Sequence, residues 1–357
     1  MSSPVSTPDA ETTLGKFHLF GELPTELRLS ILETAARSAM PGIQFFGANW
    51  TGEAESEGPI DLELVEPRVQ DISGPLRSRV DGNPSTYNQD FGLWMASYES
   101  RDFMSRHYQR LENAITEEED PNTLFGDQSH FVVLGGDRFS KVFPKQDLLC
   151  LQPFQTSLDY GDLPFFREDS PYKVKNLALE YDPAWMNGLV QARTDGARAQ
   201  ARADIWREDS PRGVFIRSLW ARAERTGPAN MTLWLIDSSL RRLEMPSNVF
   251  LPDSDSDSDS NKNSARNDDA VKDRPKKAEP EPRVFQSMGA RCVEVKDLSE
   301  CVYAALKPNT AFHFLHELQI SVGFNIDWMI SVRRNQDAIP LANGLEDLVK
   351  VLCVEPN

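Results

Sequence analysis

Short apolar runs separated by helical patterns constrain the fold of this chain more than any other feature. Each run has the length of a strand and contains β-branched or aromatic residues. The runs are residues 131–134, 147–151, 174–181, 231–237 and 291–295. Between the third and the fourth run, Phe215, Leu219 and Ala223 recur at the spacing of one helical face. Near-continuous apolar strands that alternate with helices predict an α+β fold, with a mixed sheet covered by helices on at least one face.

Charge and composition narrow the classes of protein that this chain can be. The 357 residues include 38 Lys and Arg against 55 Asp and Glu, which gives a formal net charge of −17. Such acidity makes a nucleic-acid partner unfavourable, because a nucleic-acid-binding protein needs a basic surface to displace counterions. With 39% hydrophobic residues, most of the chain can bury a core. One large domain with insertions and two domains both fit this length.

The cysteines and the N-terminus indicate the compartment. The four cysteines, Cys150, Cys292, Cys301 and Cys353, are scattered and form no C-x-x-C pair, which favours a reducing environment. Residues 1–13 lack the basic and apolar regions of a signal peptide, and no apolar stretch reaches the length of a membrane span. We expect a cytoplasmic or nuclear protein with no membrane partner.

Three acidic segments divide the chain. Residues 51–71 hold seven acids against Arg68, residues 116–127 hold five acids and no base, and residues 253–282 begin with alternating Asp and Ser. The last segment has almost no large hydrophobic residue, so it cannot offset the entropy of ordering. We therefore predict a disordered N-terminus (1–13), a domain (14–252) with acidic insertions at 51–71 and 116–127, a disordered linker (253–282), and an α/β segment (283–357) that completes the same domain.

The N-terminal region contains the most informative pattern. Pro24 suits the start of a helix, where its missing N–H is not needed, and Glu26 lies where the helix dipole favours an anion. Leu27, Ile31 and Ala35 then form one apolar row, which Leu23 and Leu32 widen. This row predicts a helix that packs against another part of the protein.

A second helix is expected over residues 93–115. Met104, Tyr108, Leu111 and Ile115 recur at i, i+4, i+7 and i+11, which is the spacing of a buried helical face. Its first half contains the sequence Glu99-Ser100-Arg101.

Together these passages resemble the fungal two-EXR domain, a family named for its paired Glu-x-Arg motifs. The resemblance rests on Leu23-Pro24, on Glu26-Leu27-Arg28 and on Glu99-Ser100-Arg101, and it extends with decreasing specificity to about residue 240. The chain departs from the family in the long acidic insertion and at residues 96–98. Because the resemblance implies no established activity, we expect a non-enzymatic intracellular module that binds other proteins.

The same opening also looks like the start of an F-box, the helical module that binds the Skp-type adaptor of cullin ubiquitin ligases. An F-box would continue directly into further helices, whereas residues 41–46 predict a turn and a strand. We therefore expect an F-box-like helical N-terminal segment packed on the sheet. A substrate receptor of a ubiquitin ligase is the alternative function.

The paired motifs allow a structural prediction. Residues at i and i+2 of a helix point about 200° apart, so neither motif can form an ion pair within itself. We expect the two helices to pack together, with Arg28 beside Glu99 or Arg101 beside Glu26. A charged site for a partner or ligand is the second interpretation.

Catalytic motifs are absent from the sequence. It contains no dinucleotide-binding fingerprint, no P-loop and no nucleophile elbow. His313 and His316 lie at i and i+3 but have no adjacent third ligand, so we predict no metal site, no cofactor and no catalytic residue. An enzyme whose site is not visible as a motif is a further alternative.

Two tryptophans are candidates for an exposed interaction rim. Trp185 follows Asp182-Pro183, and Trp206 lies among charged residues, whereas Trp220 and Trp234 stand in apolar patterns typical of a core. Large aromatic side chains are frequent in interaction surfaces.

Overall fold

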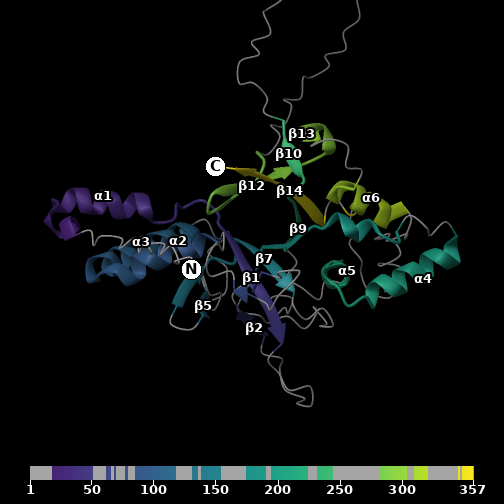
Figure 1. Ribbon diagram of the computed structural model, residues 1–357, viewed down its shortest axis with the longest axis horizontal. Coiled ribbons are helices and arrows are strands. Elements are labelled where there is room, and N and C mark those ends of the chain that lie inside the picture. The colour runs from purple at the N-terminus through teal and green to yellow at the C-terminus, as the bar shows by residue number, and fades with distance from the viewer. Residues whose placement is uncertain are drawn as a thin grey trace, which may run out of the picture.

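A computed structural model describes the parts of the chain that form the fold (Figure 1). The described residues are 18–50, 62–65, 68–69, 77–78, 85–117, 131–135, 138–153, 174–189, 194–223, 231–243, 281–303, 309–320, 345 and 348–356. The predictions for the N-terminus (1–13), for residues 118–127 of the second acidic insertion and for residues 253–280 of the linker lie outside them.

The helical elements fall into two groups along the chain. They are η1 (His18–Glu22), α1 (Thr25–Ala35), α2 (Thr86–Ala96), α3 (Tyr98–Glu117), η4 (Pro183–Met186), α4 (Asp195–Trp206), α5 (Pro211–Ala223), η5 (Leu298–Glu300) and α6 (Ala311–Ile320). Figure 1 shows α1, α2 and α3 together at one end of the molecule and α4, α5 and α6 at the other.

The strands form one large sheet and three small pairs. They are β1 (Ile43–Trp50), β2 (Leu62–Val65), β3 (Arg68–Val69), β4 (Arg77–Ser78), β5 (Phe131–Gly135), β6 (Arg138–Val142), β7 (Leu148–Pro153), β8 (Asn176–Glu180), β9 (Thr232–Asp237), β10 (Leu240–Arg242), β11 (Val284–Ser287), β12 (Ala290–Val295), β13 (Cys301–Tyr303) and β14 (Val349–Pro356). The small pairs join β3 to β4, β5 to β6 and β10 to β13.

The large sheet is mixed, as predicted. Its strand order is β11-β12-β14-β9-β8-β7-β1-β2, and the five strands β1, β7, β8, β9 and β14 run parallel. At the edges, β2, β12 and β11 pair antiparallel with their neighbours. The pairing of β14 with β9 places the C-terminal segment in the same sheet as the rest of the chain.

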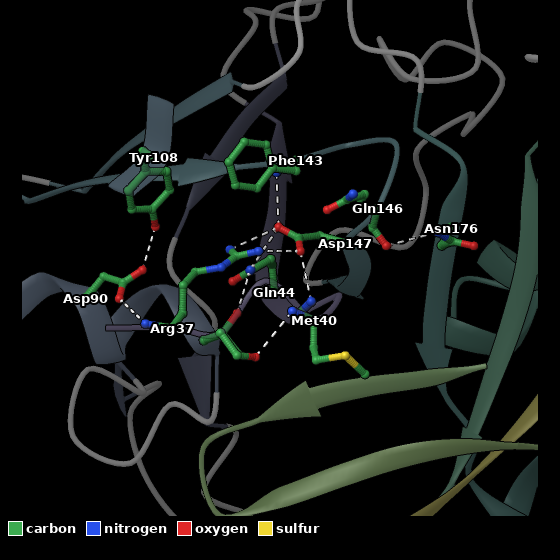
Figure 2. Close-up of polar contacts among 12 residues, drawn as sticks. Arg37, Met40, Gln44, Asp90, Tyr108, Phe143, Gln146, Asp147 and Asn176 are labelled. Atoms are coloured by element: carbon green, nitrogen blue, oxygen red, sulfur yellow. Dashed lines mark hydrogen bonds and ion pairs between the residues drawn. The ribbon is translucent and has the colours of Figure 1, made fainter. Parts of the chain in front are cut away.

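The sheet curls so that its edge strand β11 reaches the segment that precedes β1. The backbone N–H of Gln286 in β11 donates to the carbonyl oxygen of Pro41 at 2.8 Å, and Gln286 forms a parallel bridge with Gly42, just before β1. Strand β11 therefore returns to the segment that leads into β1. The β-hairpin of β11 and β12 passes close to this segment in the close-up of Figure 2.

Alternating side chains of the strands fill two cores. On one face, Phe46, Leu149 and Leu177 belong to a cluster that also contains Phe215 of α5 and Phe314 of α6. The residues that precede or follow them in the strands point to the other face, because side chains alternate along a strand.

This second face is the interior of the curl. Phe45, Cys150, Ala178, Trp234 and Phe285 are all buried there, and the ring of Phe285 meets that of Trp234 edge-on at 5.4 Å. Burial on both faces explains why the strands could be recognised as continuous apolar runs.

The N-terminal helices have a core of their own. Leu32 of α1 packs with Trp94 of α2, with Met104 and Tyr108 of α3, and with Phe143 near the sheet. The three helices thus pack together although β1 and β2 lie between α1 and α2 in the sequence.

Two predictions about local structure were wrong. The helix expected over residues 93–115 is interrupted at Ser97, because Ser97 and Ser100 cap α3 reciprocally: the Ser100 N–H donates to Ser97 Oγ at 3.0 Å, and the Ser97 N–H donates to Ser100 Oγ at 2.9 Å. The acidic segment 51–71, expected to be a loop, contributes strand β2. Its apolar and charged residues, Leu62-Glu63-Leu64, alternate as an edge strand requires.

Candidate functional site

The paired motifs meet where α1 crosses the start of α3. Nε of Arg28 donates to Oε1 of Glu99 at 3.1 Å, so the predicted pairing of these two residues is confirmed. Nη1 of Arg28 also donates to the carbonyl oxygens of Gly21 and Leu23, at 3.1 and 2.8 Å. Arg28 therefore joins three segments, namely η1, the start of α1 and the start of α3.

The other members of the motifs have local roles. Arg101 is exposed and its Nε donates to the carbonyl oxygen of Ser97 at 3.3 Å, while Glu26 is exposed in the first turn of α1. The interactions of the described residues do not include the alternative pairing of Arg101 with Glu26. Pro24 lies at the N-cap of α1, where its carbonyl oxygen accepts hydrogen bonds from the N–H groups of Leu27 and Arg28 at 3.1 Å each.

The outer side of α1 carries exposed apolar side chains. The predicted row of Leu27, Ile31 and Ala35 does not face the core, since Leu27 is 53% exposed and Ile31 is 44% exposed. The core is contacted instead by the row of Leu29, Leu32 and Ala36 on the other side of the helix. The helix packs through Leu32, which belongs to the predicted row, but the centre of that row was placed wrongly. Helix α1 has apolar side chains on two sides, and in the described part of the chain the side with Leu27 and Ile31 is exposed.

A buried polar network lies between the N-terminal helices and the sheet, as Figure 2 shows. Arg37, in the loop after α1, binds Asp147 with Nη2–Oδ1 and Nη1–Oδ2 distances of 2.8 and 3.2 Å. The Asp147 carboxylate also accepts from the N–H groups of Gly42 (2.9 Å) and Phe143 (3.0 Å) and from Nε2 of Gln44 (3.1 Å). Both partners of the ion pair are buried, with side chains 3% and 0% exposed.

A second carboxylate extends the network into α2 and α3. The carboxylate of Asp90 accepts from the backbone N–H of Arg37 at 2.8 Å and from the Tyr108 hydroxyl at 2.5 Å. Nε2 of His107 lies 3.0 Å from the carbonyl oxygen of Arg37. The network therefore includes groups from the α1–β1 loop, from α2, from α3 and from the turn that precedes β7.

Burial and neighbouring charges together shift the pKa values of this network. It raises the pKa of Asp90, although the hydrogen bonds from Tyr108 and Arg37 oppose the shift. The pKa of Tyr108 is raised by burial and then by the charge of Asp90. Burial acts to lower the pKa of Arg37, but the charge of Asp147 and its hydrogen bond outweigh it and raise that pKa. These groups are enclosed and mutually hydrogen-bonded, so the network holds the helices on the sheet and offers no surface to a substrate.

Cavities also occur elsewhere in the described part of the chain. One, of about 1180 Å³, lies between α6 and the start of β14 and is lined by Phe312, His316 and Lys350 among others. Its volume suits a small molecule. Two of its cations are engaged: Lys350 pairs with Glu294 at 2.5 Å, and Nη1 of Arg283 donates to Oδ1 of Asn176 at 2.9 Å.

The second cavity, of about 760 Å³, lies at the carboxyl ends of β8 and β9, where parallel sheets often bind ligands. Arg212 on its wall pairs with Glu208 at 2.7 Å and donates to the carbonyl oxygens of Trp185 and Asn187 at 2.6 Å. Within the described ranges, no group of three or more His, Cys, Asp or Glu could hold a metal ion.

The predicted aromatic rim is not exposed. Trp185 is only 6% exposed and contacts Tyr181 and Phe314 edge-on at 5.7 and 5.5 Å. Trp206 is half-buried against the core and meets Trp220 edge-on at 5.2 Å. The prediction was wrong for Trp185 because Asp182 caps η4, accepting from the Ala184 N–H at 2.8 Å, and this turn directs the tryptophan inward.

Sequence reasoning did not find the Arg37 network. Arg37 and Asp147 are 110 positions apart and belong to no motif. The only local signal is that Asp147 directly precedes an apolar strand, where a buried carboxylate needs a cationic partner.

Comparisons with known proteins add no relative. A scan against protein-family models finds no match, and searches of curated proteins and of solved structures find none either. Across the described residues, no helix combines the length and the apolar character needed to cross a membrane.

Proposed function

We propose that this chain is a non-enzymatic protein-interaction module of the two-EXR type that uses the outer side of α1 as its contact surface. The observation that carries this proposal is the exposure of Leu27 and Ile31 on a helix whose position is held by the Arg28–Glu99 pair. Exposed apolar side chains grouped on one element are typical of interaction surfaces.

The distribution of exposed apolar residues supports this choice. Eight large hydrophobic residues are exposed among the described residues, and five belong to the N-terminal helices or the loop after α1. These five are Leu27, Ile31, Met40, Met95 and Tyr98. Tyr98 precedes Glu99 and Leu27 precedes Arg28, so the Arg28–Glu99 pair brings the backbones at these two positions close together.

The polar groups favour binding over catalysis. The ionisable groups Arg37, Asp90 and Tyr108 are enclosed between the helices and the sheet, where Asp90 accepts hydrogen bonds from both of the others. They serve the placement of α1 and not a reaction. The proposed partner is a protein in the cytoplasm or the nucleus.

Site-specific photocrosslinking tests the proposal. A photoreactive amino acid replaces Leu27 in one sample and Met288, a similarly exposed residue of the β11–β12 turn, in another. We expect one partner to crosslink from position 27 in the native cell, and this crosslink to be lost when Ile31→Asp is added. Equal crosslinking from both positions, or a crosslink that survives Ile31→Asp, would contradict the proposal.

One observation favours a second candidate, an F-box-like receptor that binds a Skp-type adaptor. Helices α1, α2 and α3 pack around a shared core that includes Leu32, Trp94 and Met104. The second and third helices that an F-box needs after its first helix are therefore present, but they follow the acidic insertion in the sequence. Calorimetric titration of the intact chain with purified Skp-type adaptor tests this candidate. Binding that is abolished by Leu27→Asp would support it, and the absence of heat with folded protein would remove it.

A further inference from the structure

We infer that the partner of α1 is an amphipathic helix with Lys or Arg along one flank of its apolar stripe. This inference rests on the proposed function, because it concerns the same surface. It follows from the arrangement of charged and apolar side chains around α1.

The solvent side of α1 has two parallel edges. With about 100° between successive residues, Leu27 and Ile31 lie on one edge, and Glu26 and Glu33, seven residues apart, lie on the other. Ser30 lies between the two edges. All five residues are exposed. A helix that packs along this side would meet apolar side chains on one flank and carboxylates on the other.

The acidic edge lacks strong compensation by neighbouring cations. Glu33 approaches Arg110 only at 4.0 Å, and both side chains are more than 60% exposed, so water screens this pair. Arg28, the cation within α1 itself, is occupied by Glu99 and by two carbonyl oxygens. Glu26 is exposed beside Leu27. The surface therefore attracts cations next to its apolar edge.

Charge also argues against a second copy of this chain as the occupant. Two α1 helices packed antiparallel would bring Glu26 and Glu33 of each copy close to the same carboxylates of the other, and like charges at such an interface are unfavourable. In a parallel pair, these carboxylates would instead face the apolar edge of the other copy and lose water without gaining a cation. A single helix face buries a small area, which is typical of weak and transient complexes. A basic amphipathic helix satisfies both edges.

Binding of designed peptides tests the inference. Three fluorescent peptides of about 18 residues, which is about five helical turns, are designed as amphipathic helices with the same leucine stripe. They differ only in the residues that flank this stripe, which are Lys in one peptide, Gln in the second and Glu in the third. A fourth peptide has the composition of the Lys peptide in scrambled order, which controls for attraction to the chain as a whole. Fluorescence anisotropy with the full-length protein measures each affinity.

We expect the Lys peptide to bind about tenfold more tightly than the Gln peptide at low salt. This ratio of affinities should fall as the salt concentration is raised from about 50 to about 200 mM. The Glu and scrambled peptides should bind most weakly. Glu26→Lys with Glu33→Lys should remove the preference for the Lys peptide, whereas Met288→Asp, far from this surface in sequence, should leave all affinities unchanged.

The outcomes separate the inference from the proposed function. One outcome would keep α1 as a docking surface but overturn the charge inference. In that outcome, the Lys and Gln peptides bind the unaltered protein with equal affinity, and Leu27→Asp with Ile31→Asp lowers both affinities to the same extent. If that double variant changes no affinity, the proposed function fails as well. Tight binding of the scrambled peptide would overturn the inference, because the attraction would then come from net charge alone.

Discussion

Arg37 and Asp147 form a buried, two-pronged ion pair that joins the N-terminal helices to the large sheet. The two residues are 110 positions apart, and their closest atoms, Nη2 and Oδ1, are 2.8 Å apart. Removing one member of such a pair leaves the other charge buried without compensation, which is far more costly than removing both.

We therefore expect Asp147→Asn to lower the free energy of unfolding by about 3–5 kcal/mol. Urea denaturation followed by circular dichroism measures the change. As a control, Asp102→Asn removes an exposed pair with Arg106 and should cost less than about 1 kcal/mol. Equal effects of the two substitutions would contradict the role given to Asp147.

The raised pKa of Asp90 predicts a pH-dependent stability. Because burial raises this pKa above its ordinary value of 3.8, the folded state holds the proton more tightly than the unfolded state. The contribution of Asp90 to stability is then full below pH 3.8 and is lost as the pH rises through the folded-state pKa. Tyr108, Arg37 and His107 face this carboxylate and limit the shift, since all three favour its charged form.

Asp90→Asn should remove that dependence, since the amide cannot titrate. Its stability relative to the unaltered protein should increase as the pH rises from about 4 towards neutrality. Urea denaturation of both proteins at a series of pH values tests this expectation. A difference that is constant with pH would show that Asp90 has the same pKa in the folded and unfolded states.

The Arg28–Glu99 pair should show unequal effects of its two members. Its side chains are 19% and 38% exposed, so Glu99→Gln should cost less than about 1 kcal/mol. Arg28→Ala should cost more, because it also removes the hydrogen bonds to the carbonyl oxygens of Gly21 and Leu23. Exchange of the two residues, Arg28→Glu with Glu99→Arg, should not restore stability, since a glutamate cannot donate to those carbonyls. Thermal unfolding of the three variants checks this order.

Ser97 should be a stabilising cap for α3. Ser97→Ala removes the acceptor for the Ser100 N–H and should cost about 0.5–2 kcal/mol. Ser105→Ala, in the exposed middle of the same helix, should change stability by less than about 0.5 kcal/mol. Chemical denaturation of both variants gives the comparison, and a larger effect at Ser105 would show that the cap is unimportant.

The four cysteines should be inert in the folded protein. All four are free and buried, and burial raises the pKa of Cys292 and of Cys301 to about 12. Because the thiolate is the reactive species, a thiol reagent such as Ellman's reagent should modify them only as the protein unfolds. Rapid modification of the native protein would contradict this expectation.

Several elements could be predicted from the sequence because their signals are local. The strands around Leu149, Leu177 and Leu235 are buried on both faces, which requires continuous apolar runs. The Arg28–Glu99 pair could be predicted because two helices with complementary motifs had to pack somewhere. The break at Ser97 was missed, since a serine cap within an otherwise helical pattern resembles an ordinary polar position.

The sequence by itself determined the kinds of elements, the mixed sheet and the residues that favour burial, because periodicity and residue type act over one or two turns of chain. Only the tertiary structure decided which of the two apolar sides of α1 is covered and that Trp185 is buried. It also decided that Gln286 hydrogen-bonds to Pro41 and that Arg37 pairs with Asp147. These outcomes depend on contacts between segments far apart in the chain, and the energy of such contacts comes from shared burial that no local pattern encodes.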